Sequence, residues 1–338
     1  MHTIGWDLHQ RESQLCILDA AGAVVREQRI ATRVTRFAAA VSPLVPCRIL
    51  LEASTESQWV ATALAALGAE VIVADPRFGA MYATRSRRVK TDQRDARALA
   101  EACYRGTYHH AHQLSAEQRA VREQLAVRGA LVRTRARYIV QLRTLVRSRG
   151  LRVPTGTASH FLARLQTLTL PADLAAPVAP LCALLPVLST QIHLLDQQLT
   201  SVANASVLRL QTLPGIGPIT ALAFVATLDD AARFLNTEQV AAYCGLVPSE
   251  YSSGEHQRRG RITKAGNTHL RSLLVEAAWS VMRTKRADAE PLRAWATRLT
   301  LRRGKSIAMV ALARRLAGIA WRCWRDETDY NGTRLGAH

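Results

Sequence analysis

The segment HTIGWDLHQRESQLCILDAAGAVVREQRI, residues 2–30, decides the fold of the first part of the chain. Residues 2–8 and 14–19 are short runs of β-type composition, and the Ala21-Gly22 pair is typical of a turn before a third extended run, AVVREQRI. The pattern therefore predicts three consecutive strands in an N-terminal meander. Asp7 lies at the end of the apolar part of the first strand.

The chain that follows alternates between helical and extended patterns. A helix-like segment around 33–44 precedes the apolar run CRILLE, which ends at Glu52, and a second helix-like segment over 56–67 precedes the run EVIVAD. Strands separated by helices favour parallel pairing, and ligands gather at the carboxyl ends of such strands. We therefore expect Asp7 and Glu52 at one edge of a sheet, an organisation similar to that of an RNase H-like nuclease domain.

Two further acids, Asp92 and Asp95, lie three residues apart in KTDQRDARALAEAC and therefore share one face of a predicted helix. A solvated loop carboxylate or a helix cap is the ordinary interpretation of any one of these acids. Four of them in compatible places would repel one another, and a chain of formal charge +19 has cations available for isolated acids. The set therefore indicates a hard divalent cation with oxygen ligands, and metal-assisted phosphodiester chemistry.

The charge balance indicates a phosphate-rich partner, because 45 Lys and Arg residues stand against 26 Asp and Glu residues. Nucleic acid is the first expectation and an acidic membrane surface the second. No stretch resembles a membrane span of about 20 apolar residues or a signal peptide, so we expect a soluble, intracellular protein. The six cysteines form no Cys-x-x-Cys pair, and we expect buried small side chains rather than zinc ligands or disulfides.

A basic stretch leads into the predicted Asp92 helix and would grip phosphates beside a metal site, although simple surface charge balance is the alternative. Its cations are Arg85, Arg87, Arg88 and Lys90. The histidines of HHAH, residues 109–112, are expected to lie in a polar loop, because the sequence places no further metal ligand near them.

The middle of the chain carries ten arginines and one acid between residues 119 and 152, on a helical pattern. Apolar residues recur there, and again over 184–203, at spacings typical of a coiled-coil seam. We expect the proline-rich stretch 171–186 to break the intervening chain, and the two helices to form a hairpin or an intermolecular bundle. The seam residues are Val121, Leu125, Val132, Ile139 and Val146, then Leu185, Ile192, Leu195, Leu199 and Val202.

The segment LQTLPGIGPITALAFVATL, residues 210–228, has the form of a helix-hairpin-helix, and a plain interhelical turn is its alternative. Gly215 and Gly217 permit a tight turn, and the backbone amides at the start of the second helix would cradle a phosphate. Further on, Ser252-Ser253-Gly254 is followed by a group of cations that would stabilise charge on a phosphoryl group. Taken alone, a Ser-Gly pair is more often a turn than a nucleophile. The cations are Arg258, Arg259, Arg261 and Lys264.

Five motifs together resemble the DEDD transposases of insertion-sequence family 110, in order and over nearly the whole chain. The motifs are GWD, LLEAS, KTDQRDARALA, LPGIGPITA and GLVPSEYSSGEHQRRGRITKAGNTHLR. The resemblance implies an α/β plus all-α protein in three parts. Residues 1–112 would form an RNase H/RuvC-like nuclease domain, 113–205 a basic, coiled-coil helical linker, and 206–330 a mainly α-helical transposase domain with the helix-hairpin-helix and a catalytic serine loop.

The resemblance also implies the chemistry of the site. Mg²⁺, or Mn²⁺ in its place, would be held by Asp7, Glu52, Asp92 and Asp95, and Ser253 would be the nucleophile, with the adjacent Ser252 left open. Two positions depart from the family's pattern. Trp6 replaces a β-branched residue before the first aspartate, and His9-Gln10 replaces a lysine.

Such a protein would be a bacterial, cytoplasmic, site-specific recombinase without a membrane partner, associated with the nucleoid when bound to donor and target DNA. The resemblance further implies a dimer or tetramer guided by a structured RNA, with one subunit's serine completing another's metal centre. Two alternatives stay open. One is a structure-selective nuclease of the Holliday-junction resolvase type that uses metal-activated water, and the other is a non-catalytic nucleic-acid-binding protein.

Overall fold

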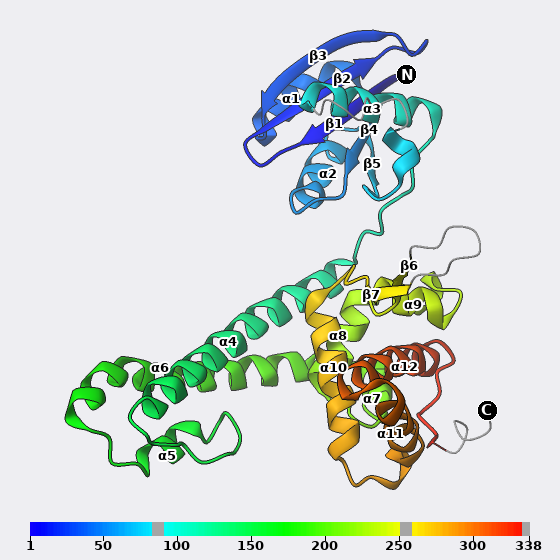
Figure 1. The fold of residues 1–338 in the computed structure, drawn as a ribbon. Helices are drawn as coiled ribbons and strands as arrows, with labels where there is room; N and C mark the ends of the chain where they lie inside the picture. Colours follow the sequence, from blue (N-terminus) through cyan, green and yellow to red (C-terminus); the bar gives the residue numbers. More distant parts are fainter. Residues whose placement is uncertain (83–90, 251–258, 333–338) are drawn as a thin grey trace. The chain divides into compact units, whose positions relative to one another are not determined.

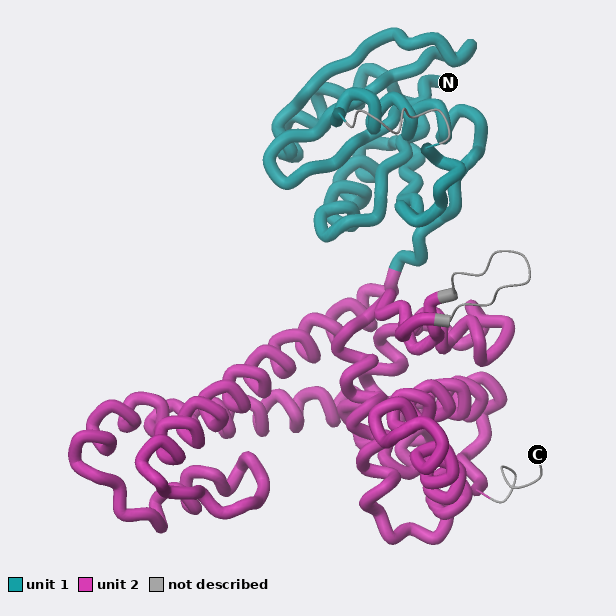
Figure 2. Tube along the Cα trace, viewed as in Figure 1, with its two compact units in different colours: residues 1–113 teal, residues 114–338 magenta. Residues whose placement is uncertain are grey.

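The computed structural model describes residues 1–82, 91–250 and 259–332, and the chain separates into two compact units (Figures 1 and 2). The first unit is Met1–Gln113 and the second is Leu114–His338. The first is a mixed α/β unit and the second is mainly helical. The finer division of the second unit at residue 205 stays a prediction.

The first unit contains one five-stranded sheet in the order β3-β2-β1-β4-β5. Its antiparallel part is the predicted meander of β1 (His2–Leu8), β2 (Glu12–Leu18) and β3 (Val24–Ala31). Its parallel part joins β1 to β4 (Cys47–Glu52) and β4 to β5 (Glu70–Ala74), as the alternation of strands and helices indicates.

Helices cover the two faces of this sheet differently. On one face, α1 (Val34–Val41) and α2 (Ser57–Ala65) cover an apolar cluster in which the ring of Trp6 meets Phe37 edge-on. The other face is covered by α3 (Asp92–Arg105), whose Leu99 packs against Leu50 of β4. Successive side chains of a strand point to opposite faces of the sheet, so every second residue of β1 and β4 faces α3 and the residues between them face α1 and α2.

The predicted polar loop at residues 109–112 lies along the edge of β5. His110 forms an isolated bridge with Ala74, and the ring of His109 stacks on Phe78. The cysteines are free thiols, five of them buried and Cys182 half-buried, as expected of small core side chains.

In the second unit, α4 (Ala116–Arg147) and α6 (Ala172–Ser201) form a long hairpin, with the short α5 (Phe161–Gln166) packed at its tip (Figure 1). Arg128 pairs with Asp196 over 2.9 Å, and Arg149, just beyond α4, pairs with Asp173 over 2.7 Å. Later residues of α4 thus meet earlier residues of α6, so the helices are antiparallel.

Most of the predicted seam of this hairpin is buried. In α4 the buried members are Val121, Leu125, Ile139 and Val146, and in α6 they are Leu185, Ile192 and Leu199. Val132 and Leu195 are half-buried, whereas Val202 is 48% exposed and lies outside the seam. The heptad face of α6 starts earlier than predicted, because Leu174 and Val178 are also buried there.

The expectation that the prolines between residues 171 and 186 break the chain is wrong. Pro177, Pro180 and Pro186 lie inside α6, all with exposed side chains. A proline leaves the carbonyl four residues earlier without its helical donor, and water can satisfy that carbonyl on an exposed face. The buried face of α6 is kept free of proline.

By length and composition α6 could also cross a membrane, and it is the single helix of this kind in the described part of the chain. The expectation that no stretch is long and apolar enough to resemble a membrane span is therefore wrong for α6. One such helix is a weak indication of a span, and Leu174, Val178 and Leu185 of α6 pack in an apolar cluster with residues of α4 and α5.

The remaining helices of the second unit share one apolar core with α8, in which every residue from Thr220 to Leu228 is buried. The indole of Trp321 in α12 donates a hydrogen bond to the carbonyl of Ala231 over 2.9 Å, which ties the last helix to this core. The elements are α7 (Ala205–Leu210), α8 (Pro218–Leu228), α9 (Thr237–Tyr243), β6 (Pro248–Glu250), β7 (Arg259–Ile262), α10 (Thr268–Arg283), α11 (Glu290–Arg303) and α12 (Lys305–Arg325).

Candidate metal centre and nucleic-acid surfaces

Asp7 and Glu52 lie on the face of the sheet that α3 covers. Gly5 shares this face, because a Cβ there would meet the backbone of Ala96 in α3. Asp7 comes two residues later in β1 and is therefore on the same side. The parallel pairing of Trp6 with Leu51 sets the register, so the next residue of each strand, Asp7 and Glu52, continues it at the carboxyl ends. Asp7 is buried and Glu52 half-buried.

The first turn of α3 brings two further acids to this face. Thr91 has extended backbone angles, and its hydroxyl accepts a hydrogen bond from the amide of Arg94 over 3.3 Å, which caps the helix. Asp92 and Asp95 then lie in the first turn, where carboxylates are favoured by the helix dipole. Asp95 is buried one turn before Leu99 on the sheet-facing stripe, whereas Asp92 is half-buried.

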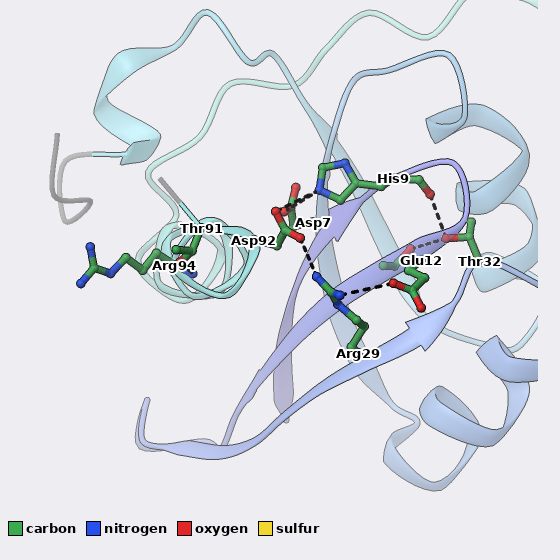
Figure 3. A network of polar contacts seen from close by, with 9 residues as sticks. Asp7, His9, Glu12, Arg29, Thr32, Thr91, Asp92 and Arg94 are labelled. Atoms are coloured by element: carbon green, nitrogen blue, oxygen red, sulfur yellow. Dashed lines mark hydrogen bonds and ion pairs between the residues drawn. The ribbon is translucent and has the colours of Figure 1, made fainter. Parts of the chain in front are cut away.

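His9 joins Asp7 to Asp92 (Figure 3). Its Nε2 lies 3.2 Å from Asp7 Oδ2 and 3.5 Å from Asp92 Oδ1, and one ligand atom from each of the three residues lies within 4.8 Å of the others. Within residues 1–82, 91–250 and 259–332 this is the one such group of potential ligands. Glu52 and Asp95 share the face of the sheet but do not belong to this group. The four-carboxylate ligand set stays a prediction.

Arg29 in β3 and Thr32 just after this strand hold the cluster in place. Arg29 donates from Nη2 to Asp92 Oδ2 over 2.9 Å and pairs through Nη1 with Glu12 over 3.3 Å (Figure 3). The Thr32 hydroxyl donates to the carbonyl of His9 over 2.8 Å, which fixes the backbone that carries the imidazole. Asp92 therefore keeps Oδ2 on Arg29 and turns Oδ1 toward His9.

The donor atoms suit a divalent cation. Carboxylate oxygens are the ligands preferred by Mg²⁺ and Mn²⁺, and imidazole nitrogen is accepted more readily by transition ions such as Mn²⁺ than by Mg²⁺. Asp7, His9 and Asp92 present two oxygens and one nitrogen from separate segments of the chain. His9 was not among the predicted ligands. Its position two residues after Asp7 in the motif Asp-x-His was the available signal.

Several predicted nucleic-acid contacts lie outside the described residues. These are Arg85, Arg87, Arg88, Lys90 and Arg258, and the proposed nucleophile Ser253 with its neighbour Ser252. The backbone of Arg259 begins β7, whereas Arg261 in the same strand and Lys264 just after it have exposed side chains. The two exposed cations are thus available to solvent.

The two glycines of the predicted helix-hairpin-helix have different surroundings. Gly215 has a φ of +84°, and a Cβ there would lie 2.4 Å from the carbonyl oxygen of Ala277 in α10, so tight packing requires glycine. Gly217 precedes α8 and has open space where a Cβ would be. A turn therefore joins α7 and α8 as predicted, with the start of α8 accessible beside Gly217.

Arg271 anchors the chain on both sides of the β6–β7 hairpin. Its buried guanidinium donates from Nη1 to the carbonyl of Cys244 over 3.3 Å and to that of Ala265 over 3.2 Å. Gly245 and Gly266 both have positive φ and lie against backbone atoms of the opposite segment. The two ends of the hairpin are therefore held together at its base.

A second basic surface was missed in the sequence. From Pro291 to Arg325 the chain has nine Lys and Arg residues and no Asp or Glu. Arg302, Arg303 and Lys305 are exposed where α11 ends and α12 begins, and the Lys305 ammonium lies 4.9 Å from the ring centre of Trp279. The absence of acids over this length was the available signal. Such a surface suits a phosphate backbone.

Comparison with known proteins identifies the family of this chain. Residues 4–149 match a family model of DEDD type described as "Transposase", and residues 207–292 match the model "Transposase IS116/IS110/IS902 family". A protein of Pseudomonas aeruginosa named "Probable family 20 transposase" is 34% identical over 336 residues, which cover 97% of this chain and 98% of the relative. These matches define a DNA transposase of the DEDD class.

Two further relatives are named after insertion sequences. The transposase for insertion sequence element IS1111A of Coxiella burnetii is 29% identical over 94% of this chain and 88% of its own length. The transposase for insertion sequence element IS1328 of Yersinia enterocolitica is also 29% identical, over 94% of this chain and 95% of its own length. The chain belongs to the IS110 family of transposases, a DEDD family whose chemistry implies a divalent metal.

Proposed function

We propose that this transposase cleaves and rejoins the DNA of an insertion sequence with a divalent metal, Mg²⁺ or Mn²⁺, held by its DEDD acids. The observation that carries the proposal is the meeting of Asp7 and Asp92 through His9 at the carboxyl end of β1. Glu52 is aligned with Asp7 by strand register, and Asp95 lies one turn before Leu99 on the same helix face as the core contacts. When bound, the ion would supply charge to stabilise a reacting phosphate.

Ser253 is proposed as the nucleophile. Its hydroxyl oxygen would release its proton and attack the scissile phosphorus, the P–O bond to the leaving DNA end would break, and the freed DNA oxygen would take up a proton. The resulting phosphoserine link would keep the bond energy for rejoining. Arg261 and Lys264 would neutralise the phosphates near this step. The proposal for Ser253 is supported by the family resemblance of its loop, and Ser252 is the adjacent alternative.

Donor and target DNA are the proposed substrates, and a structured RNA from the element is the proposed guide. Both are supported by the net charge of +19 and by the exposed cations of α11 and α12. We further propose a dimer or tetramer that works on the nucleoid in the bacterial cytoplasm, with one subunit's serine acting at another's metal centre. Exposed apolar side chains on the α4–α6 hairpin support self-association, namely Val127, Val140, Leu184, Val187 and Leu194.

The metal part of the proposal is tested with Asp7→Asn and Asp92→Asn. Each variant should lose Mg²⁺-dependent cleavage and recombination while it still binds DNA, because one ligand charge is removed and the basic surfaces remain. Cleavage at the wild-type rate in both variants would remove these acids from the mechanism.

The RNA that co-purifies with the wild-type protein should be sequenced and added back, with recombination of matching DNA as the readout.

The nucleophile is tested by trapping. Denaturing gels of the reaction with labelled DNA should show a covalent protein–DNA adduct that is lost in Ser253→Ala and kept in Ser252→Ala. The reverse pattern would move the nucleophile by one residue. Metal-dependent cleavage without an adduct in any variant would favour attack by water, as in a resolvase-type nuclease.

A further inference from the structure

The geometry around His9 resembles part of a coordination shell. Neighbouring ligands of an octahedral ion with bonds of about 2.1 Å lie about 3.0 Å apart. His9 Nε2 lies 3.2 Å from Asp7 Oδ2 and 3.5 Å from Asp92 Oδ1. The distances from the nitrogen to the two oxygens are therefore within about half an ångström of the spacing that a common ion would impose on neighbouring ligands.

The imidazole is held by contacts that do not involve the acids. The Thr32 hydroxyl donates its proton to the carbonyl of His9, so it accepts the 2.8 Å hydrogen bond from the Ser13 hydroxyl inside the core. Ser13 and Thr32 are both buried, so the backbone at His9 is tied to rigid parts of β2 and the end of β3. This leaves the His9 ring at the mouth of the site with its Nε2 directed at the carboxylates (Figure 3).

Arg29 determines which oxygen of Asp92 is turned toward His9. The guanidinium binds Oδ2 over 2.9 Å, and Oδ1 is the atom that approaches the imidazole. Asp7 is buried in β1 and has little freedom to turn. Three donors from β1, the turn after it and α3 are therefore preorganised toward one point.

We infer that His9 is a third protein ligand of the divalent ion and that it makes this centre select Mn²⁺ over Mg²⁺. The inference rests on the proposed metal site and adds a residue and an ion preference to it. Mg²⁺ favours oxygen donors and retains its waters, whereas imidazole nitrogen suits first-row transition ions. An oxygen-only centre would lack this source of preference.

The test uses the full-length wild-type protein with Mn²⁺ as a paramagnetic probe. Pulsed electron paramagnetic resonance should show nitrogen couplings from an imidazole bound directly to Mn²⁺. These couplings should vanish in His9→Gln, which keeps a polar side chain of similar length. They should persist in His2→Gln, a control at the opposite end of β1, where the ring contacts the carbonyl of Leu18.

Calorimetric titration supplies the second readout, which does not depend on catalysis. His9→Gln should weaken Mn²⁺ binding by about tenfold or more, because loss of even an outer-shell partner of a metal ligand costs about 10–100-fold in affinity. Mg²⁺ binding should change less than about threefold, because the oxygen donors remain and glutamine offers another. Retained Mg²⁺ affinity also shows that the variant is folded at the site.

Each other outcome has a definite meaning. Wild-type Mn²⁺ binding that requires Asp7 but shows no nitrogen coupling would overturn the role of His9 and leave the proposed metal site intact. Tighter binding of both ions by His9→Gln would also overturn it, because the imidazole would then act as a resident cation. Mn²⁺ binding that is unchanged in both Asp7→Asn and Asp92→Asn would remove the proposed site itself.

Discussion

A Cβ atom placed on Gly5 would lie 2.1 Å from the carbonyl oxygen of Ala96, so β1 and α3 meet backbone to backbone at this point. The contact lies two residues before Asp7 on the strand and four residues after Asp92 on the helix. The separation of the two carboxylates is therefore set by a contact in which no side chain can intervene.

Gly5→Ala should accordingly damage both the fold and the metal centre. The added methyl group must push α3 away from β1, and overpacking of this kind costs about 1–3 kcal/mol. Urea unfolding should show the loss, and Mn²⁺ titration should show weaker binding. Gly79→Ala is the matched control, because a Cβ there has no atom within 4 Å. Equal stability of the two variants would contradict the close contact.

Gly215 and Gly217 should separate stability from DNA binding. Gly215→Ala combines a left-handed backbone with a clash against Ala277 and should lower the melting temperature clearly. Gly217→Ala meets open space and should leave the melting temperature nearly unchanged, while its methyl group hinders a phosphate at the start of α8. Fluorescence anisotropy with duplex DNA measures the second effect. Wild-type affinity in Gly217→Ala would argue for a plain interhelical turn.

The cations between α11 and α12 should make salt-dependent contacts with nucleic acid. Replacing Arg302 and Arg303 by alanine should weaken binding to unrelated sequences equally and reduce the slope of log affinity against log salt by about 1 for each lost phosphate contact. Arg325→Ala is a suitable comparison, because its guanidinium already pairs with Asp326 over 2.6 Å. An unchanged slope in the double variant would exclude this surface.

The second unit should lose stability on mild acidification because of His269. Burial lowers the pKa of this imidazole below its ordinary value of 6.5, with Arg133 and Arg128 as further causes. The folded state therefore takes up the proton less readily than the unfolded chain, so stability is present above pH 6.5 and is lost as pH falls toward the lowered pKa.

The measurement is the melting temperature between pH 8 and pH 5.5 by calorimetry. His269→Gln should show a smaller decline than the wild type, whereas His160→Gln, at an exposed position, should decline like the wild type. A decline of equal size in all three proteins would assign the acid sensitivity to other groups. The Nε2 of His269 is buried and has no hydrogen-bond partner among the described residues, so protonation there gains no compensating acceptor.

The sheet of the first unit could be predicted because its strands are local patterns. The run CRILLE and the neighbouring runs are short and mainly apolar, a pattern typical of buried strands. The ends of these runs give the positions of Asp7 and Glu52. The meeting of Asp7 with Asp92 needed the long-range packing of α3 on Gly5, which the acid spacing alone does not specify. The geometry of that packing came from the structure.

Other features depended on neighbours that are distant in sequence. His9 reaches the acids because Thr32, just after the third strand of the meander, donates a hydrogen bond to its carbonyl and so holds its backbone. Arg29 is one of many arginines in the sequence, and nothing local distinguishes it as the partner of Asp92. The prolines of α6 were misread because their local effect on a helix depends on which face is exposed. The roles of Glu52, Asp95 and Ser253 stay predictions.

Arg271 also couples the β6–β7 hairpin to the helical core of the second unit. Because its guanidinium joins the carbonyls of Cys244 and Ala265, one residue of α10 holds the chain just before β6 and just after β7. A displacement of α10 would therefore move both strand ends together rather than one at a time.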